Sequence, residues 1–456
     1  MIQFPHENQS NQDRETIATV EPIATRTFTP TQAVIARSAG VYHWTAEGRR
    51  LFDFTSGVLV SNLGHNPVEW QKRFLAYLGW SDPGSLTGEY FNAAPLTAYN
   101  AVTHLEAQAS RRLVDFCHRQ PGGQRVEQVL WAASGSEAIQ KSLWAAMHFQ
   151  PQRQMILATR FGFHGKKGLS HAVTGSENDP ERDPRVRFIS FPREECADLS
   201  TRDQPFDCSK YEAEWHALWA EHGSKIGTVI TEPYLGGGGS YHPHAEYLQR
   251  LQRFCREREI VFILDEVQAN FGRTGELFAY TKYGLEPDLI VLGKGLGNGV
   301  PVAAVVGRKA LFASLNYGEA SDTWSANPLS SAAVAATLDE FDRRDVIGPM
   351  RESSAILEAG LVSLKEFPMI GHVRGEKGGM VWGVETRETR GVSANEWANR
   401  IVKQCYLGDG SSKADGVHLL GPLAGKVIRI SPPLVITLEQ CRAAIGLIRT
   451  ALSRLQ

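Results

Sequence analysis

A lysine and an aspartate follow two apolar segments near the middle of the chain. Asp265 comes directly after the apolar run Ile260–Leu264, and Lys294 follows Leu289–Leu292 within a Gly-Lys-Gly sequence. Burying an ammonium at the end of a strand is costly unless the group is paired or used covalently. One covalent use is Schiff-base chemistry, in which a lysine that loses its proton easily attacks a carbonyl. Asp265 suits the same chemistry, because pyridoxal phosphate needs an anion beside its ring nitrogen.

Lys294 taken alone fits a tight turn with a solvated side chain equally well. Neighbouring residues exclude two nucleotide-binding alternatives. A phosphate-binding loop for nucleoside triphosphates needs Gly where Asp288 stands, and Ser or Thr where Gly295 follows the lysine. A dinucleotide fingerprint fails because Asn298 stands where its last glycine belongs.

Ser134-Gly135-Ser136-Glu137 follows an expected strand and opens an expected helix. Backbone N–H groups and hydroxyls at the N-terminus of a helix can hold a phosphate. The simpler alternative is an ordinary helix start with a serine cap. The segment is a candidate phosphate anchor that depends on support from the other site residues.

Two further candidates follow other expected strands. Phe163-His164-Gly165 offers a ring to stack on a flat pyridine and a glycine that allows close approach, although His164 alone is more typical of a packed core. Glu232 ends another strand, before the glycine run Gly236–Gly239. Its place at the carboxyl end of a strand favours a role in the site, and a solvated cap is the alternative.

The segments that position these residues alternate between apolar strands and helices. This pattern predicts an α/β fold with a mostly parallel seven-stranded sheet flanked by helices. Helical spacing recurs between the strands, for example in Ile139, Leu143 and Met147. The strands are expected at Val126–Ala132, Met155–Thr159, Val186–Phe191, Ile226–Thr231, Ile260–Leu264, Leu289–Leu292 and Ala303–Val306.

We expect a large cofactor-binding domain at 71–344 and a smaller α+β lobe built from both ends of the chain. Its C-terminal part, 345–456, has expected strands at Met380–Val384 and Val427–Ile430. Thr437 and the Gln three residues later can form a capping box that opens the last helix.

Residues 1–70 are expected to join the small lobe to a subunit interface. They show weak periodicity up to about Pro30, which suggests a segment that wraps the surface or a partner subunit. Val41–Phe54 alternates around Glu47-Gly48 and predicts a hairpin that presents the following loop, 56–66.

Composition favours a soluble enzyme over a polymer-binding protein. A net charge of −2 with scattered Lys and Arg gives no basic face for nucleic acid or anionic lipid. The six cysteines are dispersed without the spacing of a zinc pair, so no metal site is expected. The polar start of the chain lacks the pattern of a secretory signal, and no apolar run reaches the roughly 20 residues of a membrane span. We therefore expect a cytoplasmic protein.

The combined motifs resemble those of class III aminotransferases, which are pyridoxal-phosphate enzymes of fold type I. The resemblance extends from about residue 40 to the C-terminus, and its most specific part is Asp-Glu-Val-Gln followed later by Gly-Lys-Gly. The motifs occur in the family's order: Ser134-Gly135-Ser136-Glu137-Ala138, Phe163-His164-Gly165, Glu232-Pro233, Asp265-Glu266-Val267-Gln268, Gly272-Arg273-Thr274-Gly275, Gly293-Lys294-Gly295-Leu296, Asn327-Pro328 and Arg429.

The resemblance implies that Lys294 forms the Schiff base with the cofactor and that Asp265 pairs with the pyridine nitrogen. Val267 would pack on one ring face opposite Phe163, and Gln268 would reach the phenolic oxygen. The full set of cofactor-binding residues implied is Ser134, Gly135, Ser136, Phe163, His164, Glu232, Asp265, Val267, Gln268, Lys294 and Thr323.

The resemblance also implies a homodimer, because Thr323 would add a hydroxyl to the phosphate site of the neighbouring subunit. An Arg at the place of Arg429 clamps the α-carboxylate of 2-oxoglutarate in relatives, and Glu232 is the residue that can pair with this Arg when that carboxylate is absent. Val58, Leu59, Tyr90 and Trp324 are candidates for an apolar substrate pocket, although each is more often simple packing.

Three departures from the family pattern leave the substrate open. Ala269-Asn270 stands where Thr-Gly is common, Ser325-Ala326 replaces a frequent Gly-Gly, and Lys166 stands where Arg is frequent. We expect an aminotransferase that moves an amino group from an amine or amino acid, omega-amino acids included, to a 2-oxo acid such as 2-oxoglutarate or pyruvate. An amino-acid racemase or epimerase on the same scaffold is the alternative, and a catalytically silent binding protein is a third.

Overall fold

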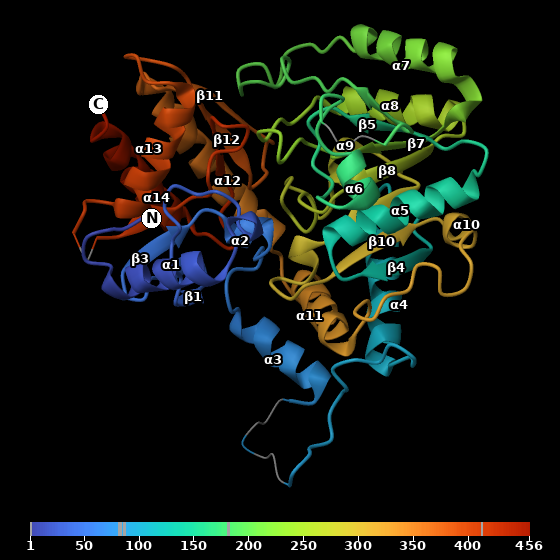
Figure 1. Cartoon of the computed structure of the whole chain (residues 1–456), viewed down its shortest axis with the longest axis horizontal. Coiled ribbons are helices and arrows are strands. Elements are labelled where there is room, and N and C mark those ends of the chain that lie inside the picture. The colour runs from blue at the N-terminus through green and yellow to red at the C-terminus, as the bar shows by residue number, and fades with distance from the viewer. Residues whose placement is uncertain (1, 81–83, 85–87, 180–182, 412–413) are drawn as a thin grey trace.

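A seven-stranded sheet forms the centre of the large lobe in the computed structural model, which describes residues 2–80, 84, 88–179, 183–411 and 414–456 (Figure 1). The strand order is β4-β10-β9-β8-β7-β5-β6. The strands from β9 to β6 pair in parallel, whereas β10 is antiparallel to both of its neighbours. The strands are β4 (Gln128–Ala132), β5 (Met155–Thr159), β6 (Val186–Ile189), β7 (Ile226–Thr231), β8 (Val261–Asp265), β9 (Leu289–Leu292) and β10 (Ala303–Gly307).

The predicted sheet is confirmed, and each predicted strand end lies within two residues of the observed one. The central strands are buried on both faces, which explains their nearly continuous apolar sequences. Alternate residues along β8 enter two different core clusters, such as Ile263 in one and Phe262 in the other. The sheet therefore has a helical layer on each side.

Helices cover the two faces of this sheet (Figure 1). On one face α5 (Gly135–Phe149) packs against β9 and β10, with α6 (Gly168–Ala172) and α10 (Lys309–Phe312) beside it. On the other face α8 (Ala245–Glu257) packs against β8. The remaining helices of this part are α3 (Val68–Leu78), α4 (His104–His118), α7 (Ser209–His222), α9 (Ala279–Tyr283) and α11 (Pro328–Arg343).

The C-terminal part contains a three-stranded antiparallel sheet in the order β11-β12-β14. β14 has the predicted bounds, whereas β12 begins two residues later than predicted. The capping box of Thr437 and Gln440 is present. The elements are β11 (Ile370–Gly375), β12 (Trp382–Thr386), β14 (Val427–Ile430), α12 (Ile347–Ser363), α13 (Ala394–Leu407) and α14 (Leu438–Ser453).

The N-terminal segment joins the C-terminal part through a second sheet, β1-β2-β3-β13. β2 (Tyr42–Trp44) and β3 (Arg50–Asp53) form the predicted hairpin, and β3 pairs in parallel with β13 (Gly416–His418). Figure 1 shows the two chain ends together on one side of the molecule, as expected for a small lobe built from both termini. The sequence did not predict α1 (Asn8–Val20) or β1 (Arg37–Ala39). The domain boundaries remain a prediction.

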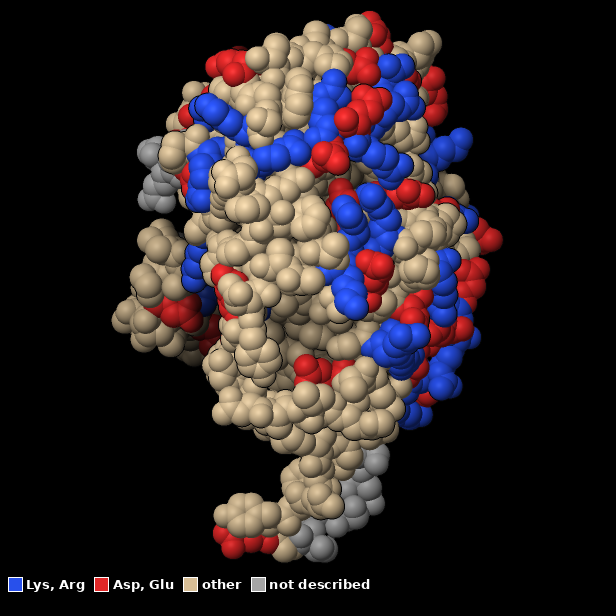
Figure 2. Space-filling view, turned by 90° about the vertical axis from the view of Figure 1, so that its right-hand side faces the viewer, with Lys and Arg blue, Asp and Glu red and all other residues tan. Residues whose placement is uncertain are grey.

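The surface mixes charges of both signs. On the face shown in Figure 2, Lys and Arg side chains alternate with Asp and Glu along the upper and right-hand margins, around a broad centre with few charged side chains. Within the described part of the chain, no helix combines the length and apolar character that spanning a bilayer requires.

Candidate active site

Asp265 and Lys294 lie at the carboxyl ends of two adjacent strands. Asp265 is the last residue of β8 and is in register with Val291 of β9, and Lys294 follows β9 by two residues. Burial lowers the pKa of the Lys294 ammonium to about 8, and the positive charge of Arg429 adds to this effect against the attraction of Asp265 and Glu232. An amine that loses its proton near neutral pH is suited to nucleophilic attack on a carbonyl.

The turn that carries Lys294 is held by its surroundings. Lys294 has a φ of 47°, a left-handed conformation that is unfavourable for a residue with a Cβ. The Asn270 side chain is buried and donates to the carbonyl oxygens of Glu266 at 2.6 Å and of Gly293 at 3.1 Å. Asn270 therefore links the end of β8 to the residue before Lys294, a role that the sequence did not reveal.

His164 holds the carboxylate of Asp265. Its Nδ1 lies 2.7 Å from Asp265 Oδ2, and the other carboxylate oxygen accepts a hydrogen bond from the Val267 N–H at 3.0 Å. His164 is buried, and among the described residues its Nε2 has no hydrogen-bond partner. The sequence favoured a packed core role for His164 taken alone, and the structure shows a buried residue that also orients the proposed partner of the pyridine nitrogen.

Glycines stand beside Val267 and Phe163, the side chains proposed to cover the two faces of the cofactor ring. A Cβ on Gly135 would lie 3.4 Å from a methyl group of Val267, and one on Gly293 would lie 3.3 Å from the same group. A Cβ on Gly237 would lie 2.9 Å from Cβ of Phe163. Side chains at these three positions would fill the space that a flat ring between Phe163 and Val267 needs. The residues present therefore fit pyridoxal phosphate.

The N-terminus of α5 lies beside this space. The Ser134 hydroxyl caps the helix by accepting a hydrogen bond from the Glu137 N–H at 3.3 Å. Ser136 faces Gly165, where a Cβ would overlap the Ser136 hydroxyl. The positive end of a 15-residue helix with free N–H groups and hydroxyls is suited to a phosphate, in agreement with the predicted anchor.

Glu232, Gln268 and Arg429 form the other wall of the site. Glu232 accepts hydrogen bonds from the N–H groups of Phe163 at 2.8 Å and Gly236 at 3.1 Å. Burial raises the pKa of the Glu232 carboxyl to about 7. Arg429 donates to Gln268 Oε1 at 3.2 Å rather than to Glu232, and burial lowers the pKa of its guanidinium to about 10. The predicted Glu232–Arg429 pair is therefore not formed in this state.

Comparison with known proteins identifies the family. The family described as Aminotransferase class-III matches residues 87–452. The chain belongs to the class III aminotransferases. This membership confirms the predicted family, the aminotransferase reaction class and pyridoxal phosphate as the cofactor. It favours this reaction over the racemase alternative.

Named relatives extend over nearly the whole chain. The acetylornithine aminotransferase of Clostridium acetobutylicum is 30% identical over 425 residues, covering 90% of this chain and 94% of the relative. The 2-aminoadipate transaminase of Pseudomonas putida is 29% identical over 429 residues, covering 90% of this chain and 94% of the relative.

Solved structures show the same fold. An amine transaminase from an uncultivated Pseudomonas species has a TM-score of 0.78 at 23% identity, covering 96% of this chain and 97% of the neighbour. The acetylornithine aminotransferase of Elizabethkingia anophelis has a TM-score of 0.77 at 21% identity, covering 98% of this chain and 99% of the neighbour. These likenesses confirm the predicted fold type I.

In this aminotransferase a buried lysine holds the loop that contains Thr323. Lys141 of α5 is 3% exposed, and its ammonium donates to the Trp131 carbonyl oxygen at 2.8 Å and to Asp322 Oδ2 at 2.6 Å. It also donates to the Ser325 hydroxyl at 3.2 Å, which itself bonds to Asp322, and it lies 3.3 Å from Glu137 Oε1. Ser325 stands where the family often has glycine, and the structure explains this departure as part of the Lys141 network. Thr323 itself is exposed.

The candidate apolar substrate residues differ in exposure. Leu59 is 1% exposed and belongs to the core, so the structure supports its packing alternative. Val58, Trp324 and Tyr90 are exposed, with fractions of 41%, 62% and 85%. Val58 lies in a turn whose four residues, Ser56–Leu59, all have positive φ.

Proposed function

We propose that the chain transfers an amino group from an amine or amino acid, omega-amino acids included, to a 2-oxo acid such as 2-oxoglutarate or pyruvate. The observation that carries this proposal is Lys294, which follows β9 next to Asp265 at the end of β8 and whose pKa is lowered to about 8 by burial. The names of the relatives, acetylornithine aminotransferase and 2-aminoadipate transaminase, support donors with a second polar group away from the reacting amine.

Pyridoxal phosphate would be held by the proposed cofactor residues: Ser134, Gly135, Ser136 and the partner subunit's Thr323 at the phosphate, Phe163 and Val267 on the ring faces, Asp265 at the ring nitrogen, Gln268 at the phenolic oxygen and Lys294 by a covalent bond. When bound, this cofactor supplies an electron sink for the carbon that bears the amino group. His164 keeps the Asp265 carboxylate in place by its 2.7 Å contact.

Lys294 moves the proton. With an amine substrate bound, its neutral Nζ would take the proton from the carbon that bears the amino group, and the resulting ammonium would then give that proton back. General acid–base catalysis of this kind contributes about 10²- to 10⁴-fold to the rate.

Arg429 binds the carboxylate of the 2-oxo acid. Arg429 is 2% exposed and donates to Gln268 through one nitrogen, so an incoming carboxylate would find a desolvated, preoriented partner. When a donor without a carboxylate at this position binds, Glu232 would move to pair with Arg429. The pKa of about 7 lets this carboxyl change charge near neutral pH. Val58 and Trp324 would border the substrate.

A homodimer completes the site in this proposal. Exposed apolar side chains gather in the segments 90–102 and 317–324, and the hydroxyls of Tyr99 and Ser321 lie 3.4 Å apart, which places the two segments side by side. Burying such a surface against a second copy is favourable. The exposed side chains of these two segments are Tyr90, Phe91, Leu96, Tyr99, Val102, Tyr317 and Trp324.

We also propose a cytoplasmic location and retain the domain division 1–70, 71–344 and 345–456.

The test uses the purified enzyme and a panel of amines and amino acids without acceptor. A true donor converts the bound cofactor to its amino form, seen as a change in absorption, and a 2-oxo acid then reverses the change. Racemisation of an L-amino acid without any acceptor would instead support the racemase alternative. Lys294→Ala is expected to bind cofactor without covalent attachment and to lose turnover; retained transamination would contradict the role of Lys294.

A further inference from the structure

Asn270 holds the peptide bond that precedes Lys294. Its side chain is 1% exposed and lies on the segment that leaves β8. The amide nitrogen donates to the Glu266 carbonyl oxygen at 2.6 Å and to the Gly293 carbonyl oxygen at 3.1 Å, and the Val267 carbonyl oxygen lies 3.4 Å away. Because all three neighbours are acceptors, the group that faces them must be the NH₂. Asn270 therefore ties the turn after β9 to the chain that follows β8.

The turn that carries Lys294 has a reason to leave its present conformation. Lys294 has a φ of 47°, in the left-handed region that is unfavourable for a residue with a Cβ. Gly293 has no Cβ and therefore adopts most backbone angles at little cost. Rotation of the peptide plane between these two residues would release Lys294 from the left-handed region. The same rotation would swing the Gly293 carbonyl oxygen away, and the bond from Asn270 to this oxygen opposes it.

The residue after Lys294 also packs against Asn270. A Cβ on Gly295 would lie 3.1 Å from Asn270 Oδ1 and 2.5 Å from Asn62 Nδ2. Asn62 is fully buried, and its amide donates to the Asn270 carbonyl oxygen at 3.3 Å. Side-chain amides therefore contact both glycines that flank Lys294, and a larger residue at 295 would overlap them.

We propose that Asn270 is a positioning residue for Lys294, which keeps the left-handed turn from relaxing and so fixes the direction of the reactive amine. This role rests on the proposed covalent role of Lys294. Glycine is common at position 270 in class III aminotransferases, and a glycine here would leave the Gly293 carbonyl oxygen without its amide partner. Holding a reacting group in place speeds its reaction. The effect of Asn270 should therefore appear in rates and not in the affinity for the cofactor.

The rate at which the cofactor-free protein attaches pyridoxal phosphate tests this role. In attachment the neutral Nζ of Lys294 bonds to the aldehyde carbon and the aldehyde oxygen leaves as water, a change that cofactor absorption follows. Asn270→Gly should slow attachment by about tenfold or more and lower kcat by a similar factor, with KM for the donor nearly unchanged. Asn270→Leu keeps the branched shape of the side chain but has no N–H donor, and it should be slow as well.

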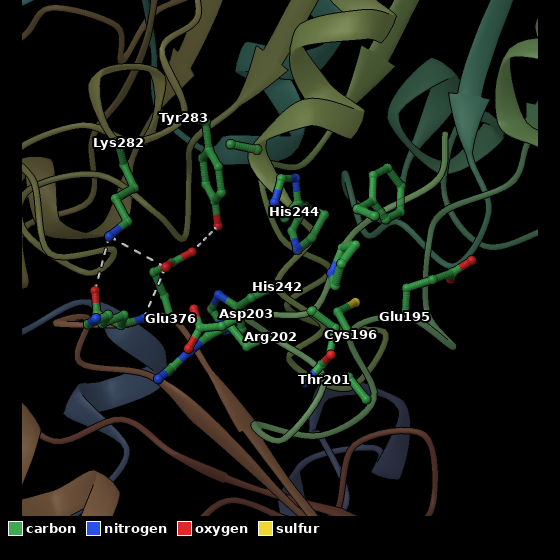
Figure 3. Close-up of a pocket in the computed structure, with 16 residues that line it drawn as sticks. Glu195, Cys196, Thr201, Arg202, Asp203, His242, His244, Lys282, Tyr283 and Glu376 are labelled. Atoms are coloured by element: carbon green, nitrogen blue, oxygen red, sulfur yellow. Dashed lines mark hydrogen bonds and ion pairs between the residues drawn. The ribbon is translucent and has the colours of Figure 1, made fainter. Parts of the chain in front are cut away.

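Two comparisons separate positioning from a general loss of stability. In Lys294→Ala protein, a further Asn270→Gly substitution should leave the affinity for non-covalently bound pyridoxal phosphate unchanged, because the group that Asn270 positions is absent. Tyr283→Phe removes a 2.6 Å hydrogen bond to Glu376 outside the proposed active site, a contact that Figure 3 shows. This control should lower stability and leave the attachment rate as it is.

Each contrary result has its own meaning. Attachment at the native rate in both Asn270→Gly and Asn270→Leu would overturn the positioning role. Weaker cofactor binding on adding Asn270→Gly to Lys294→Ala protein would also overturn it, since Asn270 would then support the site as a whole. If Lys294→Ala itself attaches the cofactor covalently, the proposed role of Lys294 is wrong and positioning by Asn270 falls with it.

Discussion

Replacing Lys294 with methionine should stabilise the cofactor-free protein at neutral pH. Methionine is unbranched and close in length to lysine, so it fills the same space without a charge. In the cofactor-free protein the ammonium of Lys294 lies in a site that disfavours it, because burial and Arg429 lower its pKa from 10.5 to about 8. Function thus requires a side chain that destabilises the fold.

The size of the effect follows from the two pKa values. A fall in the Lys294 pKa from 10.5 to about 8 corresponds to a destabilisation of the fold by about 3 kcal/mol, at 1.36 kcal/mol per pKa unit. Because the Lys294 side chain keeps partial contact with solvent, we expect about 2 kcal/mol at pH 7. The unfolded chain binds the proton more tightly, so the penalty is complete below pH 8 and disappears as the pH rises from 8 to 10.5.

Urea unfolding of the two cofactor-free proteins at pH 7 and pH 10 measures this penalty. Lys294→Met should unfold at a urea concentration higher by roughly 0.5 to 1 M at pH 7, and the difference should shrink to a small fraction at pH 10. Lys309→Met, which removes an exposed lysine, controls for the loss of a positive charge and should leave the midpoint unchanged. An equal or lower midpoint for Lys294→Met at pH 7, or a difference that does not depend on pH, would refute the reasoning.

Three further predictions concern the loaded enzyme. Asp265→Asn should keep the cofactor but lower kcat by about 10²- to 10³-fold in the donor half-reaction, because it removes the charge beside the ring nitrogen; an unchanged kcat would remove Asp265 from the mechanism. Above pH 7 the Glu232 carboxylate is charged and competes for Arg429, so KM for the 2-oxo acid should rise through pH 7 in the native enzyme and stay flat in Glu232→Gln. Lys141→Met should weaken the binding of pyridoxal phosphate by about tenfold and leave the binding of pyridoxal, which lacks the phosphate, unchanged; Lys141→Arg should retain more affinity for pyridoxal phosphate. If both ligands lose affinity equally, Lys141 does not act through Thr323.

The central site was predictable because its signals are local. Asp265 and Lys294 each follow a short apolar run, and such runs give buried parallel strands whose carboxyl ends share one edge of the sheet. The glycines around them mark close approaches that leave room for a ligand. Sequence spacing alone therefore placed the carboxylate and the amine next to each other.

Helix α1 shows where apolar periodicity fails. Its buried side chains, Ser10 and Arg14, are polar, so no apolar stripe indicates a helix. Arg14 is satisfied by Glu7 at 2.6 Å and by the Gln32 carbonyl oxygen at 3.0 Å. Asn11 of the same helix accepts a further hydrogen bond at 2.7 Å, and Glu7 directly precedes the helix, but an apolar pattern signals none of these polar contacts.

Contacts between distant segments were likewise beyond sequence reasoning. The His164–Asp265 and Gln268–Arg429 bonds join residues 101 and 161 positions apart. Each residue was a candidate on its own, but their pairing decides which atoms remain free for a cofactor or substrate. Gln268 Oε1 is taken by Arg429, so the amide NH₂ is the part of Gln268 left to face a phenolic oxygen.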